Sequence, residues 1–462
     1  MTVDDAPLTR RRLRESTQAS PTAGRRVALA WIDDEGRSLA AAPARRAEQF
    51  DMLPPLRRRR RVRAGAVGIP ALAVSGLAIA YTAAMLLWPL DNIAPSATAS
   101  DSASIVGSPS AIAWPADGAA AVGVSGFAPA VSTDTPAQMA STTKLVTALV
   151  ILDQAPLAAG EQGPEYSFTY ADRLEYWDYV GQNQSALNVP DDGSLTEYQM
   201  LQGMLIASAS NYADRLATDA FGSVEEYVTA ANAWLAENGL DGITVTDASG
   251  YDRGNVATPA AMVALAEKAL ANPVIAEIVA TETAELPGAG EFENTNALLG
   301  TDGVLGLKTG SYAGYYNLVA ARTVDLGGGP TALFASVAGA PTDGARVDDT
   351  EALLDAVAQE ASVTSTLPSG TVVAEVTTAW GAKTTLVTDE DADLHLWNGA
   401  TATAEASFDI EADAAAGADA GTLVLSGPAD QVEVPVSVKT AISGPDPWWR
   451  LTHPMQLVGG GD

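Results

Sequence analysis

One uncharged stretch constrains this chain more than any other feature of its sequence. Ala64–Leu90 runs for 27 residues without a charged side chain, and a helix needs roughly 20 apolar residues to cross a bilayer. The stretch follows the basic run Arg57–Arg63, and such flanks stay on the cytoplasmic side of a membrane. We therefore expect a single-pass cell-membrane protein with one N-terminal transmembrane helix, a cytoplasmic N-terminus and an extracytoplasmic body.

Two other interpretations of this stretch remain open. A buried core helix would also be apolar, but the length, the missing charges and the flanking arginines favour a span. A cleaved signal peptide would use the sequence ATA at Ala97–Ala99 as its processing site, whereas the 63-residue basic leader favours an uncleaved signal anchor.

Charge divides the chain at the same place. Residues 1–63 contain 15 arginines and 8 acidic residues, and the rest of the chain contains 11 basic and 49 acidic residues. An acidic body repels phosphate backbones, so we expect no nucleic-acid partner. The chain has no cysteine, which excludes disulfides, thiolate metal sites and cysteine nucleophiles.

Composition and periodicity divide the chain into six consecutive segments. They are a basic, mostly disordered cytoplasmic segment (1–63), the signal anchor (64–90), a Ser-, Ala- and Pro-rich linker (91–110), a catalytic-type domain (111–362), a β-rich domain (363–445) and a tail (446–462). In the fourth segment, helix-period patterns alternate with strands. This mixture predicts an α/β (α+β) fold with an antiparallel sheet flanked by helices, followed by a small all-β domain.

The scarcity of histidine limits the possible chemistry. The chain has two histidines, His395 and His453, and both lie outside residues 111–362. A Ser-His-Asp triad would therefore lack its base in that domain, and a histidine metal site would lack its ligands. We expect no metal and no cofactor. Acyl chemistry would instead need a lysine whose pKa falls on burial.

Ser141 and Lys144 have the spacing for that chemistry. Residues three apart share one face of a helix, so the lysine amine can reach the serine hydroxyl. The helix N-terminus also offers N–H groups to a developing oxyanion. Alone, the pattern also fits an N-capping serine with a surface lysine. However, Lys144 precedes the apolar run LVTALVIL, which is unlike a surface.

Two further polar stretches could complete a site. SASN (Ser208–Asn211) interrupts a helical pattern with groups that can relay a proton or orient an amide, although a helix cap is an alternative. LKTGSYAG (Leu307–Gly314) precedes two strand patterns. It would bring a cation and a hydroxyl to the edge of a site, and its glycine would let a ligand backbone approach closely.

In this order the three motifs resemble the signature set of the penicillin-recognising serine enzymes. The longer context resembles the serine-type D-Ala-D-Ala carboxypeptidases, the low-molecular-weight penicillin-binding proteins. The similarity extends over about residues 112–362 and includes WPADGAAAVG (Trp114–Gly123), ASTTKLVTALV (Ala140–Val150), LTEYQMLQGMLIASASNYAD (Leu195–Asp214) and GLKTGSYAGYYNLVAA (Gly306–Ala321). It implies a β-lactamase/transpeptidase-like catalytic domain.

The resemblance also implies catalytic roles. Ser141 would be the acylated nucleophile and Lys144 its general base, and Ser208 would help to carry the proton to the leaving group. The oxyanion hole would consist of the backbone N–H groups of Ser141 and Ser311.

Substrate-binding residues follow from the same resemblance. Lys308 and Thr309, in the motif completed by Gly310, would bind the terminal carboxylate of the substrate. Arg346 occupies the position at which the family often has an arginine that supports this carboxylate site, and a surface ion pair is its alternative.

The second motif departs from the family pattern. The family has Ser-x-Asn, but here the third position is Ser210 and the asparagine comes one residue later, as Asn211. Either a hydroxyl replaces the amide, or the helix begins later and Asn211 faces the cleft. The sequence does not decide between these two arrangements.

These observations predict a membrane-anchored serine carboxypeptidase. It would remove the terminal D-alanine from peptidoglycan stem peptides ending in D-Ala-D-Ala through an acyl-enzyme on Ser141, and β-lactam antibiotics would inhibit it. A β-lactamase is an alternative, although no convincing Glu-x-x-x-Asn motif lies between the second and third motifs. A transpeptidase is a second alternative. A catalytically degenerate, cell-wall-binding scaffold is a third, and its main support is Ser210, which stands where the family has an asparagine.

Overall fold

The computed structural model describes residues 64–100, 104–327 and 329–459. The predicted cytoplasmic segment 1–63 lies outside the described residues. By contacts, the chain divides into two compact units, Met1–Ala71 and Leu72–Asp462. Within the described residues, one helix is long and apolar enough to cross a membrane: Gly68–Leu87, part of α1 (Ala64–Leu87).

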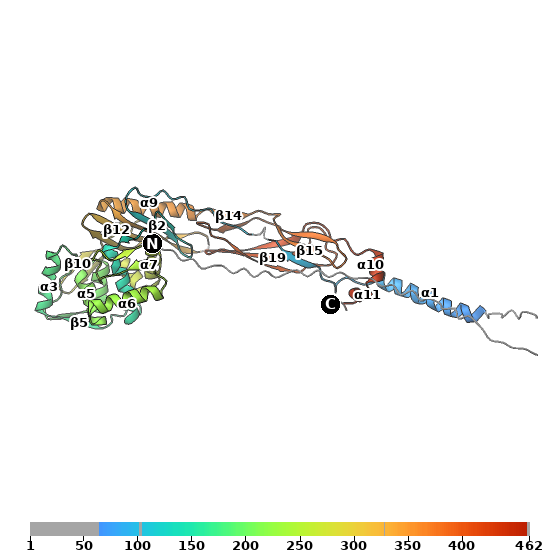
Figure 1. The fold of residues 1–462 in the computed structure, drawn as a ribbon, viewed down its shortest axis with the longest axis horizontal. Helices are drawn as coiled ribbons and strands as arrows, with labels where there is room; N and C mark the ends of the chain where they lie inside the picture. Colours follow the sequence, from blue (N-terminus) through green and yellow to red (C-terminus); the bar gives the residue numbers. More distant parts are fainter. Residues whose placement is uncertain (1–63, 101–103, 328, 460–462) are drawn as a thin grey trace, which may run out of the picture. The chain divides into compact units, whose positions relative to one another are not determined.

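A five-stranded antiparallel sheet forms the centre of the helix-rich domain (Figure 1). Its order is β11 (Val304–Tyr312), β12 (Tyr315–Asp325), β13 (Pro330–Ala340), β2 (Ala119–Val124) and β3 (Ala130–Val131). The strand β2 lies near the start of the domain in sequence and pairs with β13, which lies near the end of the domain. The two ends of the domain therefore meet in one sheet, and the helices lie between them in sequence.

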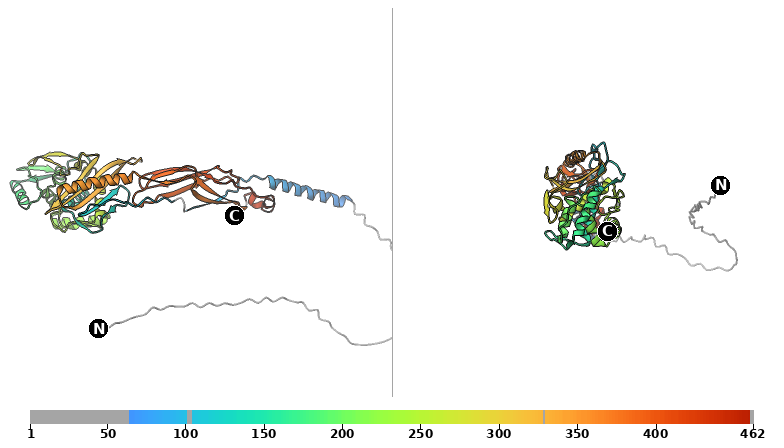
Figure 2. Two further views of the ribbon diagram at one scale, coloured as in Figure 1. Left: turned by 90° about the horizontal axis from the view of Figure 1, so that it is seen from above. Right: turned by 90° about the vertical axis from the view of Figure 1, so that its left-hand side faces the viewer.

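Helices cover both faces of this sheet, as two further views also show (Figure 2). On one face α9 (Asp343–Ala361) buries Leu353, Leu354 and Val357 against the strands. On the other lie α2 (Lys144–Gln154) and α7 (Pro259–Ala271). Central strands buried on both faces read as nearly continuous apolar runs, as β2 does. The predicted fold class, α/β (α+β) with an antiparallel sheet flanked by helices, is confirmed.

Side chains accept hydrogen bonds from the first N–H groups of the remaining helices of this domain, except in the helix that begins at Ser210, which has no such cap. Thr196 and Gln199 form a capping box at α4, and Thr169 and Asp172 form one at α3. The helices are α3 (Tyr170–Gly181), α4 (Glu197–Leu205), α5 (Ser210–Phe221), α6 (Val224–Glu237) and α8 (Pro273–Val279). Short strands connect them: β4 (Ala137–Gln138), β5 (Glu165–Phe168), β6 (Gly193–Thr196), β7 (Ile243–Thr244), β8 (Val256–Ala257), β9 (Thr283–Leu286) and β10 (Gly290–Glu293).

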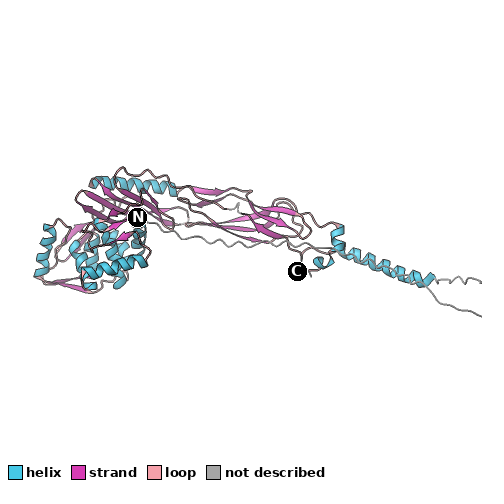
Figure 3. Ribbon diagram, in the orientation of Figure 1, coloured by secondary structure: helices cyan, strands magenta, loops and turns pink. Residues whose placement is uncertain are grey.

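The C-terminal part is built almost entirely of strands (Figure 3). Six of them form one antiparallel sheet, in the order β1 (Ser96–Ala99), β15 (Val372–Thr377), β16 (Lys383–Thr388), β20 (Gln431–Val438), β19 (Asp419–Ser426) and β18 (Thr403–Phe408). A separate pair joins β14 (Thr364–Leu367) to β17 (Ala392–His395). Two short helices follow, α10 (Pro447–Thr452) and α11 (Pro454–Leu457).

The segment expected to be a linker takes part in this sheet. Ser96–Ala99 is the edge strand β1 and pairs along its whole length with β15. Val106 and Ser108 form isolated bridges to Thr401 and Trp397. The composition of small and polar residues concealed this pairing, because an edge strand can be held by backbone hydrogen bonds without an apolar face.

Candidate active site

The first motif forms a strained turn that leads into a buried helix. Ala140–Thr143 is a short 3₁₀ turn, η2, which continues directly into α2. Ala140 has a φ of +48°, a left-handed conformation that is uncommon for a residue with a side chain. Gly250, with a φ of +81°, allows this turn, because a Cβ at residue 250 would lie 1.9 Å from the Ala140 carbonyl oxygen. The turn brings Ser141 to the helix N-terminus.

Lys144 connects three polar groups in the interior of the domain. Its Nζ donates to Ser141 Oγ at 2.9 Å, to Ser210 Oγ at 3.3 Å and to the Ser249 carbonyl oxygen at 2.6 Å. The side chain is fully buried. The structure therefore brings the predicted nucleophile and the predicted base into hydrogen-bond contact.

Burial makes this lysine a usable base. Desolvation lowers the pKa of Lys144 from 10.5 to about 8, while the nearby Asp214 and Asp247 oppose the shift. A buried ammonium loses its hydration, so the neutral amine is favoured. An amine with a pKa close to the working pH can take a proton from a hydroxyl and return it within one cycle.

The Ser249 carbonyl is held in place by a carboxylate that the sequence analysis missed. Asp247 accepts hydrogen bonds from the backbone N–H groups of Ser249, Gly250 and Asp252, at 3.0, 2.5 and 2.6 Å. Its neighbour Asn255 also donates to it. Asp247 thus fixes the loop on which Lys144 rests. The dense turn sequence TDASGYD was the available signal.

The structure separates the three polar residues of the second motif. Ser210, the first residue of α5, is buried with its hydroxyl directed to Lys144. The Asn211 side chain instead binds the backbone of Leu187, donating to its oxygen at 2.7 Å and accepting from its nitrogen at 3.2 Å. Of the two arrangements left open by the sequence, the structure thus shows the hydroxyl in the cleft.

Ser208 lacks the hydrogen bond to Lys144 that a role in carrying the proton to the leaving group would require. Its φ is +64° and it is buried. Among the described residues, none forms a hydrogen bond with its hydroxyl. The contact with Lys144 is made two residues later, by Ser210, because α4 ends at Leu205 and α5 begins only at Ser210.

The third motif lies on β11 and forms the opposite wall. The Cα of Gly310 approaches the nucleophile turn so closely that a Cβ there would lie 2.9 Å from the Met139 oxygen and 3.1 Å from the Ser141 nitrogen. The Thr309 hydroxyl is 2.6 Å from that of Thr295. A glycine at residue 310 is therefore a packing requirement of the site.

Positive charge accumulates on this wall. Lys308 is buried, and its pKa lies well below the usual value because of desolvation and the nearby cations Lys144 and Arg346. Its Nζ donates to the Thr309 carbonyl at 3.1 Å. Arg346 forms an ion pair with Asp343.

Arg346 also supports the end of β11. Its Nη1 donates to Ser311 Oγ at 3.0 Å, to the Gly310 carbonyl at 3.1 Å and to the Asn317 carbonyl at 3.2 Å. The predicted arginine therefore lies behind the third motif. It also forms the ion pair of the alternative interpretation, with the exposed Asp343, although its own side chain is buried.

These groups open onto a cleft of about 520 Å³. Serines, glutamine and tyrosines line it, and the lining includes Ser141, Ser210, Ser249, Ser311, Gln182, Ser185, Tyr251, Tyr312 and Tyr316. A cleft lined by hydroxyl groups and aromatic rings suits a small peptide. A drug-sized or peptide ligand needs a cleft of roughly this volume.

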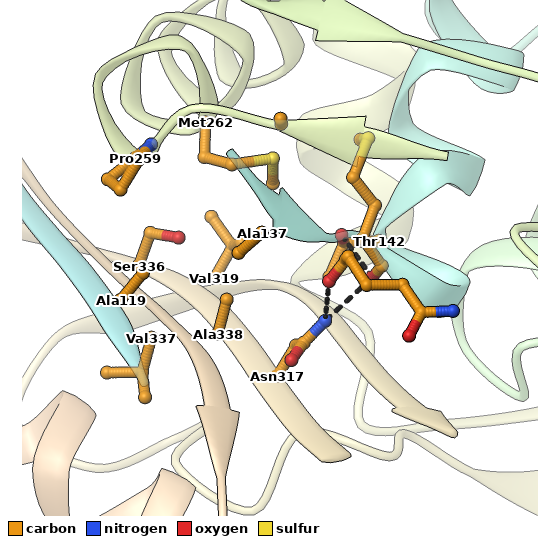
Figure 4. Close-up of a pocket in the computed structure, with 13 residues that line it drawn as sticks. Ala119, Ala137, Thr142, Pro259, Met262, Asn317, Val319, Ser336, Val337 and Ala338 are labelled. Carbon is orange, nitrogen blue, oxygen red and sulfur yellow. Dashed lines mark hydrogen bonds between the residues drawn. The ribbon is translucent and has the colours of Figure 1, made fainter. Parts of the chain in front are cut away.

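A second, much smaller space lies behind the nucleophile turn (Figure 4). Its volume is about 10 Å³, room for at most one water molecule. Asn317 Nδ2 donates to the carbonyl oxygens of Gln138 and Met139 at 2.8 and 2.9 Å, as the dashed lines in Figure 4 show. Asn317, which the sequence analysis also missed, anchors the chain just before Ser141.

Asp214 is a further residue that sequence reasoning did not find. It follows Ser210 by one turn of α5 and therefore shares its helix face. Tyr179, on α3, donates to Asp214 Oδ2 at 2.9 Å. Burial raises the pKa of Asp214 to about 6, and Tyr179 and Lys144 act in the opposite direction. No sequence motif marks Asp214 as part of the site, because its environment depends on how the helices pack.

Among the described residues, no group of three or more His, Cys, Asp and Glu side chains could hold a metal ion. The chemistry available to the site is that of a serine hydroxyl, a buried amine and a cationic wall.

Comparisons with known proteins found a matching family model and similar proteins. Residues 130–332 match the model of the D-alanyl-D-alanine carboxypeptidase family. A D-alanyl-D-alanine carboxypeptidase of Streptomyces sp. (strain K15) is 29% identical over 199 residues, with 38% of this chain and 65% of that protein covered. The chain therefore spans about two thirds of the length of this curated relative.

Solved structures of penicillin-binding proteins and D-alanyl-D-alanine carboxypeptidases also align with the chain. Penicillin binding protein 5 from Haemophilus influenzae has a TM-score of 0.48 at 19% identity, with 72% of this chain and 99% of that chain covered. A D-alanyl-D-alanine carboxypeptidase from Mycobacterium tuberculosis H37Rv has a TM-score of 0.47 at 25% identity, with 55% and 96% covered.

Proposed function

We propose that this chain, whose residues 130–332 match the model of the D-alanyl-D-alanine carboxypeptidase family, is an active membrane-anchored carboxypeptidase of that family. It removes the terminal D-alanine from peptidoglycan stem peptides through an acyl-enzyme on Ser141. The observation that carries this proposal is the 2.9 Å contact between Ser141 Oγ and the fully buried Nζ of Lys144.

In the acylation step, neutral Lys144 takes the Ser141 proton while Oγ attacks the carbonyl carbon of the penultimate D-alanine. The C–N bond of the resulting tetrahedral intermediate then breaks. The acyl group remains on Ser141, and the departing amine of D-alanine receives the proton. The N–H groups of Ser141 and Ser311 stabilise the oxyanion.

We assign the proton relay to Ser210 in place of Ser208. Ser210 Oγ is 3.3 Å from Lys144 Nζ and lines the cleft, so it can pass the lysine proton to the leaving amine. In the deacylation step, Lys144 takes a proton from water while the water oxygen attacks the acyl carbonyl carbon. The bond between that carbon and Ser141 Oγ then breaks, Lys144 returns the proton to Oγ, and the shortened peptide leaves as its carboxylic acid.

The cationic wall supports binding of a C-terminal carboxylate. The pKa of Lys308 is depressed partly by Lys144 and Arg346, so a bound carboxylate relieves their mutual repulsion. Thr309 and Ser311 offer hydroxyl groups beside it. Arg346 orients the Ser311 hydroxyl, since its Nη1 donates to that oxygen.

The contacts of β1 support an uncleaved membrane anchor. Processing after Ala99 would remove Ser96–Ala99, which is the edge strand of the six-stranded sheet. Retaining this strand also retains α1, the candidate span. The proposed location is the cell membrane, with the catalytic domain on the extracytoplasmic side.

The test is acylation by a fluorescent penicillin, combined with D-alanine release from a D-Ala-D-Ala peptide. The wild type should label and release D-alanine, and Ser141→Ala should do neither. Ser194→Ala, at a serine outside the cleft whose hydroxyl donates to Glu165 in an exposed contact, is the matched control and should behave as wild type. Labelling without D-alanine release would favour a scaffold or a β-lactamase, and equal labelling of Ser141→Ala would exclude Ser141 as the nucleophile.

A further inference from the structure

Two strand edges face each other in the C-terminal sheet. The sheet begins with β1 and ends with β18, so among the described strands each of these two has a neighbour on one side only. Both strands line one space of about 750 Å³, to which β1 contributes Ala97 and Ala99 and β18 contributes Ala404, Ala406 and Phe408. The sheet therefore curls so that its two edges flank a common groove, which we call the edge groove.

The backbone of β18 presents alternate residues to this groove. Successive residues of an antiparallel strand direct their N–H and C=O groups to opposite sides. The Asp409 N–H donates to the opposite Ala420 carbonyl at 3.0 Å, so the odd-numbered residues here face β19. Ala404, Ala406 and Phe408 then face the edge groove, and no strand in the described part of the chain pairs with them on that side.

The chain already pairs with the beginning of this edge. Immediately before β18, the Ala402 N–H donates to the Ile105 carbonyl at 3.0 Å, and the Gly107 N–H donates to the Ala400 carbonyl at 2.8 Å. Ala400 and Ala402 are even-numbered, so they lie on the same edge that continues along β18. This edge therefore supports strand pairing at its start, and its next three groove-facing residues have no partner strand among the described ones.

The walls of the edge groove permit the approach of a strand. Neighbouring strands lie about 4.7–4.9 Å apart, and small side chains allow this distance. The Ser100 N–H donates to the Val373 carbonyl at 2.9 Å, on the β15 side, so by alternation Ala97 and Ala99 face the groove. No charged side chain of the described residues lines the groove. Side chains that enter it should therefore be apolar.

Acidic side chains flank the outer face of the same groove. Glu405 lies between Ala404 and Ala406 on β18, so its exposed side chain points away from the groove interior. Glu375, on β15, is exposed on the same face, opposite Thr98 of β1. Neither carboxylate forms a hydrogen bond or an ion pair with a described residue. Opposite charges on neighbouring strands stabilise their pairing, so an added strand should carry basic side chains on this face.

We propose that β18 binds an extended segment of a partner protein as an added antiparallel strand. Apolar residues alternate with lysine or arginine in this segment, so that the apolar side chains enter the edge groove and the basic ones lie beside Glu405. Main-chain hydrogen bonds provide the affinity in this mode of recognition, and alternate side chains provide the specificity. The excess of acidic over basic residues after residue 63, 49 to 11, also favours a basic partner. The proposal depends neither on the peptidase activity nor on the membrane span.

The probe for this site is a short fluorescein-labelled peptide in which valine alternates with lysine. Its binding to the full-length, detergent-solubilised protein is measured by fluorescence anisotropy at physiological salt, and we expect saturable binding. The same peptide N-methylated at its valines lacks the N–H groups that would face β18, and it should not bind. Equal binding of both peptides would show that charge alone attracts them and would overturn the proposal, as would the absence of saturable binding.

Two variants test the contacts of the added strand. Ala406→Pro removes one N–H group that faces the edge groove, and proline is tolerated at such positions of edge strands. The affinity should fall roughly fivefold or more, the effect of one lost hydrogen bond. Glu405→Lys should weaken binding about fivefold, because it replaces attraction to the lysines with repulsion. Glu390→Lys, at an exposed turn residue that does not line the groove, is the matched control and should bind as the wild type does.

Melting temperatures of the variants show that each is folded. Wild-type affinity in Ala406→Pro, or an equal loss in Glu405→Lys and Glu390→Lys, would overturn the proposal. Concentration-dependent self-association of the wild type without peptide, lost in Ala406→Pro, would assign the edge to a second copy of this chain and would also overturn it. None of these results would bear on acylation of Ser141, which the penicillin assay measures.

Discussion

Lys144 is subject to two opposing electrostatic influences. Burial lowers its pKa from 10.5 to about 8, and Asp214 and Asp247 limit that decrease. Between pH 8 and 10.5 the unfolded chain binds the lysine proton and the folded chain does not, so this group makes the protein more stable as the pH rises through that window. Below pH 8 the cost of burying the ammonium is fully present. The same burial that lowers the stability of the protein also makes the neutral amine of Lys144 available as a base.

Replacing Asp214 should move the pH dependence of acylation. Acylation needs the neutral amine, so its rate in the wild type should rise with pH and level off above about pH 8. Asp214→Asn removes an anion that raises the pKa of Lys144, and the acid limb should therefore shift to lower pH. The measurement is the second-order rate constant of penicillin acylation across pH.

Asp219→Asn is the matched control for that experiment. Asp219 lies on the same helix and pairs with Arg215, but it does not contribute to the shift of Lys144. Its profile should follow the wild type. An unchanged acid limb in Asp214→Asn would show that Asp214 is not an electrostatic partner of the lysine, since loss of structure alone would lower the rate without moving the limb.

The two serines of the second motif should differ in importance. Ser210→Ala removes the hydroxyl 3.3 Å from Lys144 Nζ, and we expect a loss of about 100-fold in acylation rate, the size typical of general acid–base groups. Ser208→Ala removes a hydroxyl that bonds to no described residue and should have a much smaller effect. If Ser208→Ala were acylated more slowly than Ser210→Ala, the proton relay would have to be assigned to Ser208.

At the scale of residues, spacing along one helix was predictable and contacts between elements were not. The distance of three residues between Ser141 and Lys144 predicted their hydrogen bond. Whether Ser210 or Asn211 faces the cleft depended on Leu187, because both polar atoms of the Asn211 side chain form hydrogen bonds with the Leu187 backbone. The supporting roles of Asp247 and Asp214 likewise arise from loops and helices that meet only in the fold.

At the scale of elements, the site depends on how closely β11 approaches the η2 turn. The glycine at residue 310 sets this distance. Gly310→Ala would bring a methyl group to 2.9 Å from the Met139 oxygen and 3.1 Å from the Ser141 nitrogen, and the turn would have to move. A displacement of about 1 Å can lower a rate roughly 100-fold.

We therefore expect Gly310→Ala to lose most acylation while it remains folded. Gly344→Ala is the control, because a Cβ at residue 344 meets nothing within 4 Å. Rates and melting temperatures of both variants would be compared. A Gly310→Ala protein that acylates as fast as the wild type would contradict the close approach.

Periodicity predicted most elements, and the exceptions have physical causes. The two strand patterns after LKTGSYAG correspond to β12 and β13. SASN interrupts a helical pattern in the sequence, and in the structure α4 ends at Leu205 and α5 begins at Ser210, whose hydroxyl contacts Lys144. The strand β1 was missed because its pairing lies in the backbone.

At the scale of the whole molecule, the residues just after α1 are integrated into the C-terminal sheet. A chain that begins at Ser100 lacks β1 and exposes the edge of β15. A chain that begins at Asp91 keeps β1, and both shortened chains lack α1, the candidate span. We expect the shorter chain to melt at a lower temperature by a few degrees at most, since about 1 kcal/mol corresponds to roughly 2–4 °C in a protein of 150–250 residues and to less in a longer chain. Equal melting temperatures would show that β1 adds no stability and would remove the argument against processing at Ala99.

The central claim is that Ser141 is acylated with the help of Lys144, and mass spectrometry of the penicillin-treated protein tests it most directly. The account predicts one added penicilloyl group, located by peptide mapping to Ser141, and no adduct in Ser141→Ala. An adduct on another residue, or no adduct on the wild type, would contradict it.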